Sequence, residues 1–94
     1  MPFPEQIARS FTNASVYPLS PNQMGVYGLF RPGHWIYIGK GDIRQRLLDH
    51  LNGDNPCILG EGPTHWVDEV TPLMDAREKQ LILELKPSCN QIAG

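Results

Sequence analysis

An acidic side chain lies in the middle of the apolar side of a predicted helix near the end of the chain. On a helical wheel of residues 74–85, MDAREKQLILEL, Glu78 falls on a face with four apolar side chains, Met74, Leu81, Ile82 and Leu85. A carboxylate that faces a core is costly unless a positive group neutralises it. The sequence therefore predicts a partner for Glu78, either a bound metal ion or a basic side chain.

Basic residues gather in one short segment of an acidic chain. Lys40, Arg44 and Arg46 fall within seven positions, where Asp42 is the only opposing charge, and His50 follows Arg46 at helical spacing. The net charge of −2 argues against binding nucleic acid mainly through electrostatics. The cluster is still sufficient for a local anion site.

Two apolar, β-branched and aromatic runs precede this cluster. Residues 24–30, MGVYGLF, and 34–39, HWIYIG, are separated by RPG and predict a β-hairpin that carries Tyr27 and Tyr37. Seen alone, these tyrosines are typical strand aromatics with hydroxyls at the sheet edge.

Two helices and a further strand are predicted after the hairpin. Residues 42–53 form the first helix, with Asp42 as its N-cap, Gln45 completing a capping box and Gly53 ending it. Arg46 and His50 lie at the edge of its apolar side. A strand over 64–70 and a helix from near Pro72 to before Pro87 follow, with Thr71 or Asp75 as its cap. The predicted order is strand, strand, helix, strand, helix.

The remaining segments carry turn residues or weak patterns. We expect one or two helical turns over residues 4–11, an irregular segment over 12–23 and a loop over 53–63. Cys57 and Cys89 lie far apart without CxxC spacing, so free thiols are favoured over a disulfide. The chain of 94 residues suits one domain. It has no apolar run of about 20 residues and no signal-like start, which predicts a soluble, cytoplasmic protein without a membrane partner.

Five motifs in this order resemble the GIY-YIG nuclease family. They are GVY at 25–27, YIG at 37–39, the pair Arg46 and His50, the acid Glu78, and KPSCN at 86–90. The resemblance runs from Gly25 to Asn90. It implies an α+β fold, a three-stranded antiparallel sheet flanked by helices in the order β-β-α-β-α. Residues 25–94 would form the nuclease-like domain and residues 1–24 an N-terminal extension.

The resemblance also implies a role for each matching residue. Tyr27 and Tyr37 would be paired active-site phenols, Arg46 the phosphate-facing arginine with His50 beside it, and Glu78 the single metal-binding carboxylate. Around them lie Gly39, Lys40, Arg44 and Asn90 as substrate-binding or site-closing residues. The segment between YIG and the arginine is one residue shorter than in some members, so Arg44 is the alternative to Arg46. Val26 stands where the family motif has isoleucine.

The implied activity is metal-dependent hydrolysis of phosphodiester bonds in DNA with one Mg²⁺ or Mn²⁺ ion. Mg²⁺ takes only one or two protein carboxylates beside water and phosphate oxygens, so Glu78 alone would suffice. We expect Tyr27 to act as general base, with His50 relaying its proton and Tyr37 orienting water or phosphate, although the two tyrosines could exchange roles. A phenol with a pKa near 10 is ionised in roughly one molecule per thousand at pH 7. Positive groups nearby would have to favour the phenolate.

Two other functions remain open from the sequence. The first is a non-catalytic module with the same fold that binds nucleic acid or a protein partner, which the acidic balance favours. The second is a phosphodiesterase acting on RNA or a small molecule. In isolation, Arg46 and His50 read as a helix flank, and Glu78 as a structural ion pair with Arg46, Arg77 or Lys79. The short chain also implies that specificity comes from a protein partner, a homo-oligomer or the N-terminal extension.

Overall fold

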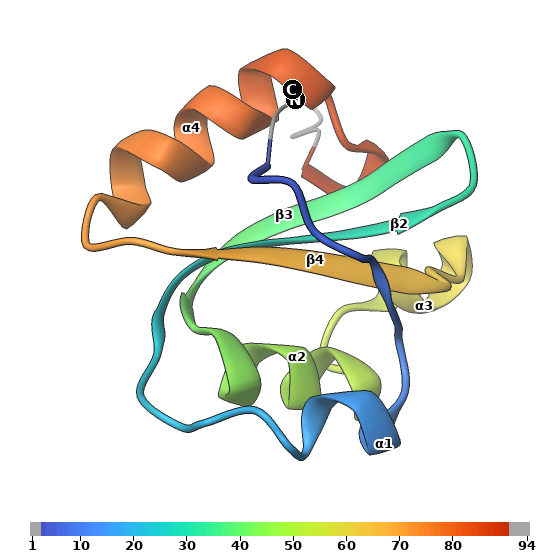
Figure 1. Cartoon of the computed structure of the whole chain (residues 1–94). Helices are drawn as coiled ribbons and strands as arrows, with labels where there is room; N and C mark the ends of the chain where they lie inside the picture. The colour runs from blue at the N-terminus through green and yellow to red at the C-terminus, as the bar shows by residue number, and fades with distance from the viewer. Residues whose placement is uncertain (1–2, 91–94) are drawn as a thin grey trace.

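A computed structural model describes residues 3–90 and shows an antiparallel sheet between helices (Figure 1). The sheet order is β1 (Arg9–Ser10), β4 (His65–Val70), β2 (Met24–Arg31) and β3 (His34–Asp42). Helix α4 (Met74–Leu85) covers one face of the sheet. Three helices lie toward the other face, α1 (Asn13–Val16), α2 (Ile43–Leu51) and α3 (Pro56–Glu61).

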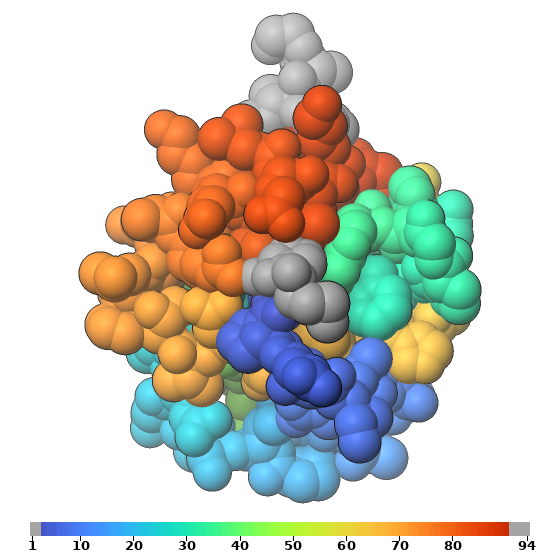
Figure 2. All heavy atoms as spheres, turned by 45° about the horizontal axis from the view of Figure 1, so that its top comes forward, coloured from blue at the N-terminus to red at the C-terminus, as the bar shows by residue number. Residues whose placement is uncertain are grey.

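The predicted α+β class is confirmed, but the predicted number of strands is wrong. The sheet has four strands instead of three, because β1 of the N-terminal segment pairs with β4 through Arg9 and Ser10. The predicted helical turns at residues 4–11 are wrong. Gln6 lies along β4, where its side chain accepts from the Asp68 backbone nitrogen at 3.1 Å and donates to the Asp68 carbonyl at 2.7 Å. These bonds hold the segment extended, and Figure 2 shows it lying beside α4 and the hairpin.

The hairpin of β2 and β3 turns both candidate phenols to the same face. Tyr27 pairs with Gly39, and Leu29 pairs with Tyr37. The register then shifts to Phe30 opposite Trp35, so one extra residue of β3 forms a bulge. Tyr27 and Tyr37 both pack in the cluster on the α2 side of the sheet.

Helix α2 begins as predicted, and the turn at its end leads the chain back toward the candidate site. The Asp42 carboxylate accepts from the Gln45 backbone nitrogen at 3.2 Å. The Gln45 side chain does not complete the predicted capping box and donates to Asp49 at 2.9 Å. The helix ends at Leu51, and Gly53 follows with φ of 83°, a left-handed conformation that glycine adopts without strain.

Two segments predicted as irregular contain short helices. Within residues 12–23, α1 is capped by Thr12, whose hydroxyl accepts from the Ser15 backbone nitrogen. Within residues 53–63, α3 is capped by Asn55 and has Pro56 in its first turn. Asn and Pro are turn residues in many loops, but in this order they also start helices, and the second role holds here.

Cys57 and Cys89 form a disulfide, so the predicted free thiols are wrong. The bond joins α3 to the 3₁₀ helix η1 (Ser88–Asn90), with a Cα–Cα distance of 5.7 Å. The two residues are 32 positions apart and come together only through the fold. Disulfides are rare in the reducing cytosol. The bond therefore weighs against the expected cytoplasmic location, which stays a prediction.

Helix α4 lies close to its predicted bounds but is capped differently. Leu73 is its N-cap and makes no side-chain cap bond. Thr71 accepts from the Leu73 backbone nitrogen before the helix begins, and Asp75 lies in the first turn, so neither predicted cap acts as one. The helix ends before Lys86, which has φ of 48°. Among residues 3–90 we find no helix of the length and apolarity needed to cross a membrane.

Candidate active site

The two phenols occupy different depths in the face that α2 covers. Tyr27 is fully buried, Tyr37 is partly exposed, and their ring centroids lie 6.3 Å apart. Gly39 lies opposite Tyr27, and a Cβ atom there would come within 2.2 Å of the Tyr27 hydroxyl oxygen. Only glycine leaves room for the phenol at this point.

Helix α2 places a buried histidine against Tyr27. The Tyr27 hydroxyl lies 2.6 Å from His50 Nε2, and His50 is only 2% exposed. The other ring nitrogen, Nδ1, lies 2.7 Å from a carboxylate oxygen of Asp54. Burial lowers the pKa of His50, and Asp54 opposes that shift. Around neutral pH His50 is therefore an uncharged ring that can accept a proton.

Arg46 lies close enough to this buried pair for its charge to act on both residues. Its guanidinium is 3.1 Å from an Asp49 oxygen and 3.8 Å from an Asp54 oxygen, and its side chain is 38% exposed. Burial raises the pKa of both Tyr27 and Tyr37, and the positive charge of Arg46 acts in the opposite direction on each. Burial prevails, so both phenols are protonated at neutral pH.

The structure distinguishes Arg46 from its alternative, Arg44. The Arg44 side chain donates to the Tyr17 carbonyl at 3.3 Å, and its guanidinium lies 5.6 Å from the centre of the Tyr17 ring. It therefore packs on the segment before β2. Arg46 is the arginine whose charge acts on both phenols.

Lys40 is the partner that the sequence required for Glu78. Its ammonium group lies 3.6 Å from the Glu78 carboxylate and also pairs with Asp75. Arg77, one of the predicted alternatives, pairs with Glu69 at 3.0 Å. The Glu78 side chain is 22% exposed, and its negative charge raises the pKa of Tyr37. The acid of α4 is thus within electrostatic range of the phenol on β3.

The donor set near Glu78 fits an ion that needs few protein ligands. No group of three or more potential metal-ligating side chains occurs among residues 3–90. One part-buried carboxylate matches the way Mg²⁺ binds a single carboxylate together with water and phosphate oxygens. Glu78 is the residue that would hold it.

Asn90 contacts the backbone of β3 through both ends of its amide. Its oxygen accepts from the Ile38 nitrogen at 2.7 Å, and its nitrogen donates to the Ile38 carbonyl at 3.0 Å. Ile38 lies between Tyr37 and Gly39, so Asn90 fixes the strand segment that shapes the site. Its predicted contact with substrate stays a prediction.

Asp54 is a site residue that the sequence reasoning missed. It follows the helix end at Gly53 and lies four positions after His50, within the segment predicted as a loop. The sequence did carry a signal for it. An acid follows the glycine that ends the helix, four residues after a histidine.

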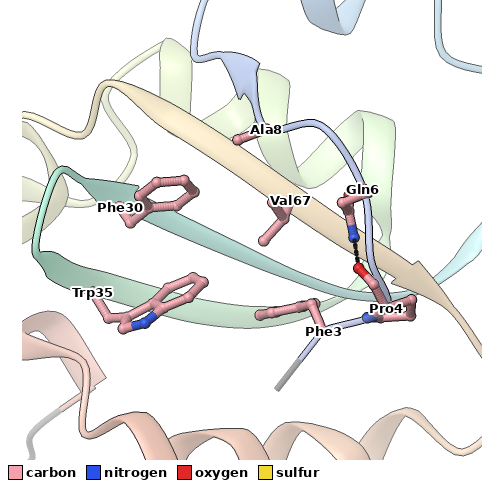
Figure 3. Close-up of a pocket in the computed structure, with 7 residues that line it drawn as sticks. All are labelled: Phe3, Pro4, Gln6, Ala8, Phe30, Trp35 and Val67. Carbon is pink, nitrogen blue, oxygen red and sulfur yellow. Dashed lines mark hydrogen bonds between the residues drawn. The ribbon is translucent and has the colours of Figure 1, made fainter. Parts of the chain in front are cut away.

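An apolar pocket on the α4 side is separate from these residues. It encloses about 230 Å³ and is lined mainly by the apolar side chains Phe3, Pro4, Ala8, Phe30, Trp35 and Val67 (Figure 3). Its polar lining residue, Gln6, is bonded to Pro4 and Asp68. Without a charged group in its lining, this pocket does not suit a phosphate or a metal ion.

Comparison with solved structures gives one consistent match. The fold is similar to the GIY-YIG N-terminal endonuclease domain of UvrC from Thermotoga maritima bound to magnesium, its catalytic divalent cation. The two share 26% identity and a TM-score of 0.68, over 85% of this chain and 100% of that chain. A tyrosine-to-phenylalanine mutant of that domain, bound to its catalytic divalent cation, matches equally well over 86% of this chain.

No protein-family model matches the sequence, and no curated protein matches it significantly. The structural match spans the whole of the UvrC domain and most of this chain. This fold match and the motif order from Gly25 to Asn90 together support membership of the GIY-YIG family.

Proposed function

We propose that this protein is a metal-dependent endonuclease that hydrolyses phosphodiester bonds in DNA with a single Mg²⁺ or Mn²⁺ ion held by Glu78. The observation that carries the proposal is the contact of Tyr27 with His50 beneath Arg46, with Glu78 in electrostatic range of Tyr37. A proton acceptor, a phosphate-binding cation and an acidic metal ligand are the groups that this hydrolysis needs.

Tyr27 is the general base in this proposal. Its raised pKa makes a free phenolate too scarce to be the working form. The hydroxyl therefore passes its proton to His50 Nε2, at 2.6 Å, while its oxygen takes a proton from the attacking water. The contact with His50 favours Tyr27 over Tyr37 for this role. Tyr37, which is more exposed, orients the water or the phosphate.

Arg46 binds the phosphate and controls access to Tyr27. Tyr27 is fully buried, so water reaches its hydroxyl only when the side chains above it move. The guanidinium of Arg46 is partly exposed and paired with the carboxylates of Asp49 and Asp54. An incoming phosphate offers it a bidentate partner, and the movement of Arg46 toward that phosphate opens the path to the phenol.

The ion would stabilise negative charge on the phosphate and on the leaving oxygen when bound. Glu78 supplies its carboxylate from the rigid frame of α4. Lys40, which pairs with both Glu78 and Asp75 in the absence of an ion, would exchange these partners for a phosphate oxygen once the Glu78 carboxylate is engaged.

Cleavage of supercoiled plasmid DNA tests the proposal. We expect nicking that requires Mg²⁺ or Mn²⁺ and is lost in Glu78→Gln. Glu84→Gln is the matched control, because Glu84 lies on the same helix and is exposed. Equal nicking by Glu78→Gln and the wild type would contradict the proposal. DNA binding without cleavage over several metals would favour the non-catalytic module, and cleavage restricted to RNA or small diesters would change the substrate class.

A further inference from the structure

We propose that Asp54 is a positioning residue whose carboxylate keeps the proton of His50 on Nδ1, so that Nε2 stays free to accept the proton of Tyr27. This inference rests on the proposed nuclease function of the same site. It adds a residue that neither the motifs nor the structural match assigned.

The argument begins with the two contacts of the imidazole. Nδ1 lies 2.7 Å from an Asp54 oxygen and Nε2 lies 2.6 Å from the Tyr27 hydroxyl. An ionised carboxylate can only accept a hydrogen bond, so Nδ1 must be the protonated nitrogen. In a neutral ring Nε2 then carries the lone pair, and the Tyr27 hydroxyl donates to it. The same arrangement orients the histidine in hydrolases that use a carboxylate, a histidine and a hydroxyl.

The backbone fixes the position of Asp54. Its nitrogen donates to the Asp49 carbonyl at 3.2 Å, and the nitrogen of Gly53 donates to the His50 carbonyl at 3.1 Å. Directly after it, Asn55 caps α3 by accepting from the Cys57 nitrogen at 3.0 Å. Asp54 is thus held between the end of one helix and the start of the next, with its side chain directed back to His50.

Asp54 is the acid that is hydrogen-bonded to His50 among the charged groups around it, and Asp49 adds a smaller electrostatic effect in the same direction. From α2, Arg46 and Asp49 face the ring, and from the sheet the rings of Tyr27 and Tyr37 lie with centroids 5.6 Å and 5.2 Å away. The carboxylate of Asp49 is bonded instead to Arg46 and to the Gln45 side chain.

The other surroundings of His50 are mainly apolar. The neighbouring pocket, which His50 helps to line, is bordered by Phe11, Leu51, Ile58, Leu59, Gly62 and Pro63. Since these groups offer the ring no competing acceptor side chain, removal of Asp54 leaves Nδ1 without its carboxylate. The ring is then free to change tautomer.

Nitrogen NMR of the histidine rings in the full chain tests the tautomer directly, without metal or substrate. In the wild type we expect the proton of His50 on Nδ1. In Asp54→Ala we expect it to move to Nε2 in most or all molecules. Asp49→Ala is the matched control. Like Asp54→Ala, it removes a carboxylate that pairs with Arg46, but it leaves the bond between His50 and Asp54 in place. Retention of the Nδ1 proton in Asp54→Ala would overturn the inference.

Cleavage tests the catalytic part of the inference. We expect the rate of Asp54→Ala and Asp54→Asn to fall at least about tenfold. The acidic limb of the pH profile should also move to lower pH, because the charge that favours the imidazolium has been removed. An unchanged limb with a lower rate would mean a merely structural role. A wild type with the expected tautomer but no cleavage would refute the proposed function itself, so the two failures are distinguishable.

Discussion

Because His50 is buried against Tyr27, it should make the free energy of unfolding depend on pH. Its pKa in the folded chain is lowered by burial, whereas an unfolded histidine titrates near pH 6.5. Below that pH the unfolded chain therefore binds more protons than the folded chain at this site. Stability then falls as the pH falls through the unfolded pKa toward the lower folded one.

The expected outcome is a steeper loss of stability on acidification in the wild type than in His50→Gln. Urea unfolding at several values between about pH 7.5 and 5.5 measures it. His34 and His65 are present in both proteins, so their contribution cancels in the comparison. Parallel stability curves for the two proteins would show that His50 does not carry the dependence.

The order of the motifs was sufficient to predict that the tyrosines of the hairpin meet the basic residues of α2, but not how deeply each side chain is buried. The hairpin and α2 have clear sequence signals, and these two elements bring four of the predicted side chains together: Tyr27, Tyr37, Arg46 and His50. The burial of a side chain depends on packing between distant parts of the chain, and this packing buries Tyr27 completely. Asp54 was missed because its role depends on the direction of the chain after Gly53.

Strand β3 approaches Tyr27 so closely at Gly39 that a larger residue there should lower the stability of the fold. In Gly39→Ala the new methyl group would meet the phenol at 2.2 Å, so either the ring or the strand must shift. We expect a loss of about 1–3 kcal/mol or more in the free energy of unfolding. Cleavage should fall together with stability, because the contact between Tyr27 and His50 depends on that ring position.

Gly60→Ala is the control for this substitution. Gly60 lies in α3, and no neighbouring atom lies within 4 Å of the place that its new methyl group would take, so alanine should be neutral or slightly stabilising there. Denaturant unfolding and cleavage rates of both variants give the comparison. Equal stability of Gly39→Ala and the wild type would mean that the strand yields easily at this point.

The disulfide between α3 and η1 predicts that stability depends on redox conditions. It closes a loop across 32 positions, for which loop entropy gives about 3–4 kcal/mol. Urea unfolding with and without reductant should show a decrease of that order in the wild type. The double variant Cys57→Ser, Cys89→Ser should show the lower stability in both conditions. Reductant that leaves the wild type unchanged would contradict this.

Strong local patterns determined which elements could be predicted. The hairpin, α2, β4 and α4 have clear periodicity or caps, and all four are present near the expected positions. The missed elements, β1, α1 and α3, are two to six residues long. Such short elements depend on tertiary contacts more than on their own propensity. The disulfide likewise had no local signal.

At the scale of the whole molecule, a net charge of −2 limits how nucleic acid can be held. If Lys40, Arg44 and Arg46 supply the phosphate contacts, the logarithm of the binding constant should fall with the logarithm of salt concentration with a slope of about −3 or shallower. Binding of Glu78→Gln to duplex DNA between about 50 and 200 mM salt measures this slope. A slope twice as steep would indicate a larger basic surface, for example one completed by a second copy of the chain.

The amide of Asn90 has a consequence for how separate molecules meet. Strand β3 forms one border of the sheet, and such borders attract strands of other molecules through unpaired backbone groups. Because both backbone groups of Ile38 are already bonded to Asn90, no neighbouring strand can add there in register. The residue that holds the β2–β3 hairpin in place therefore also protects the protein from growing into extended sheets when it is concentrated.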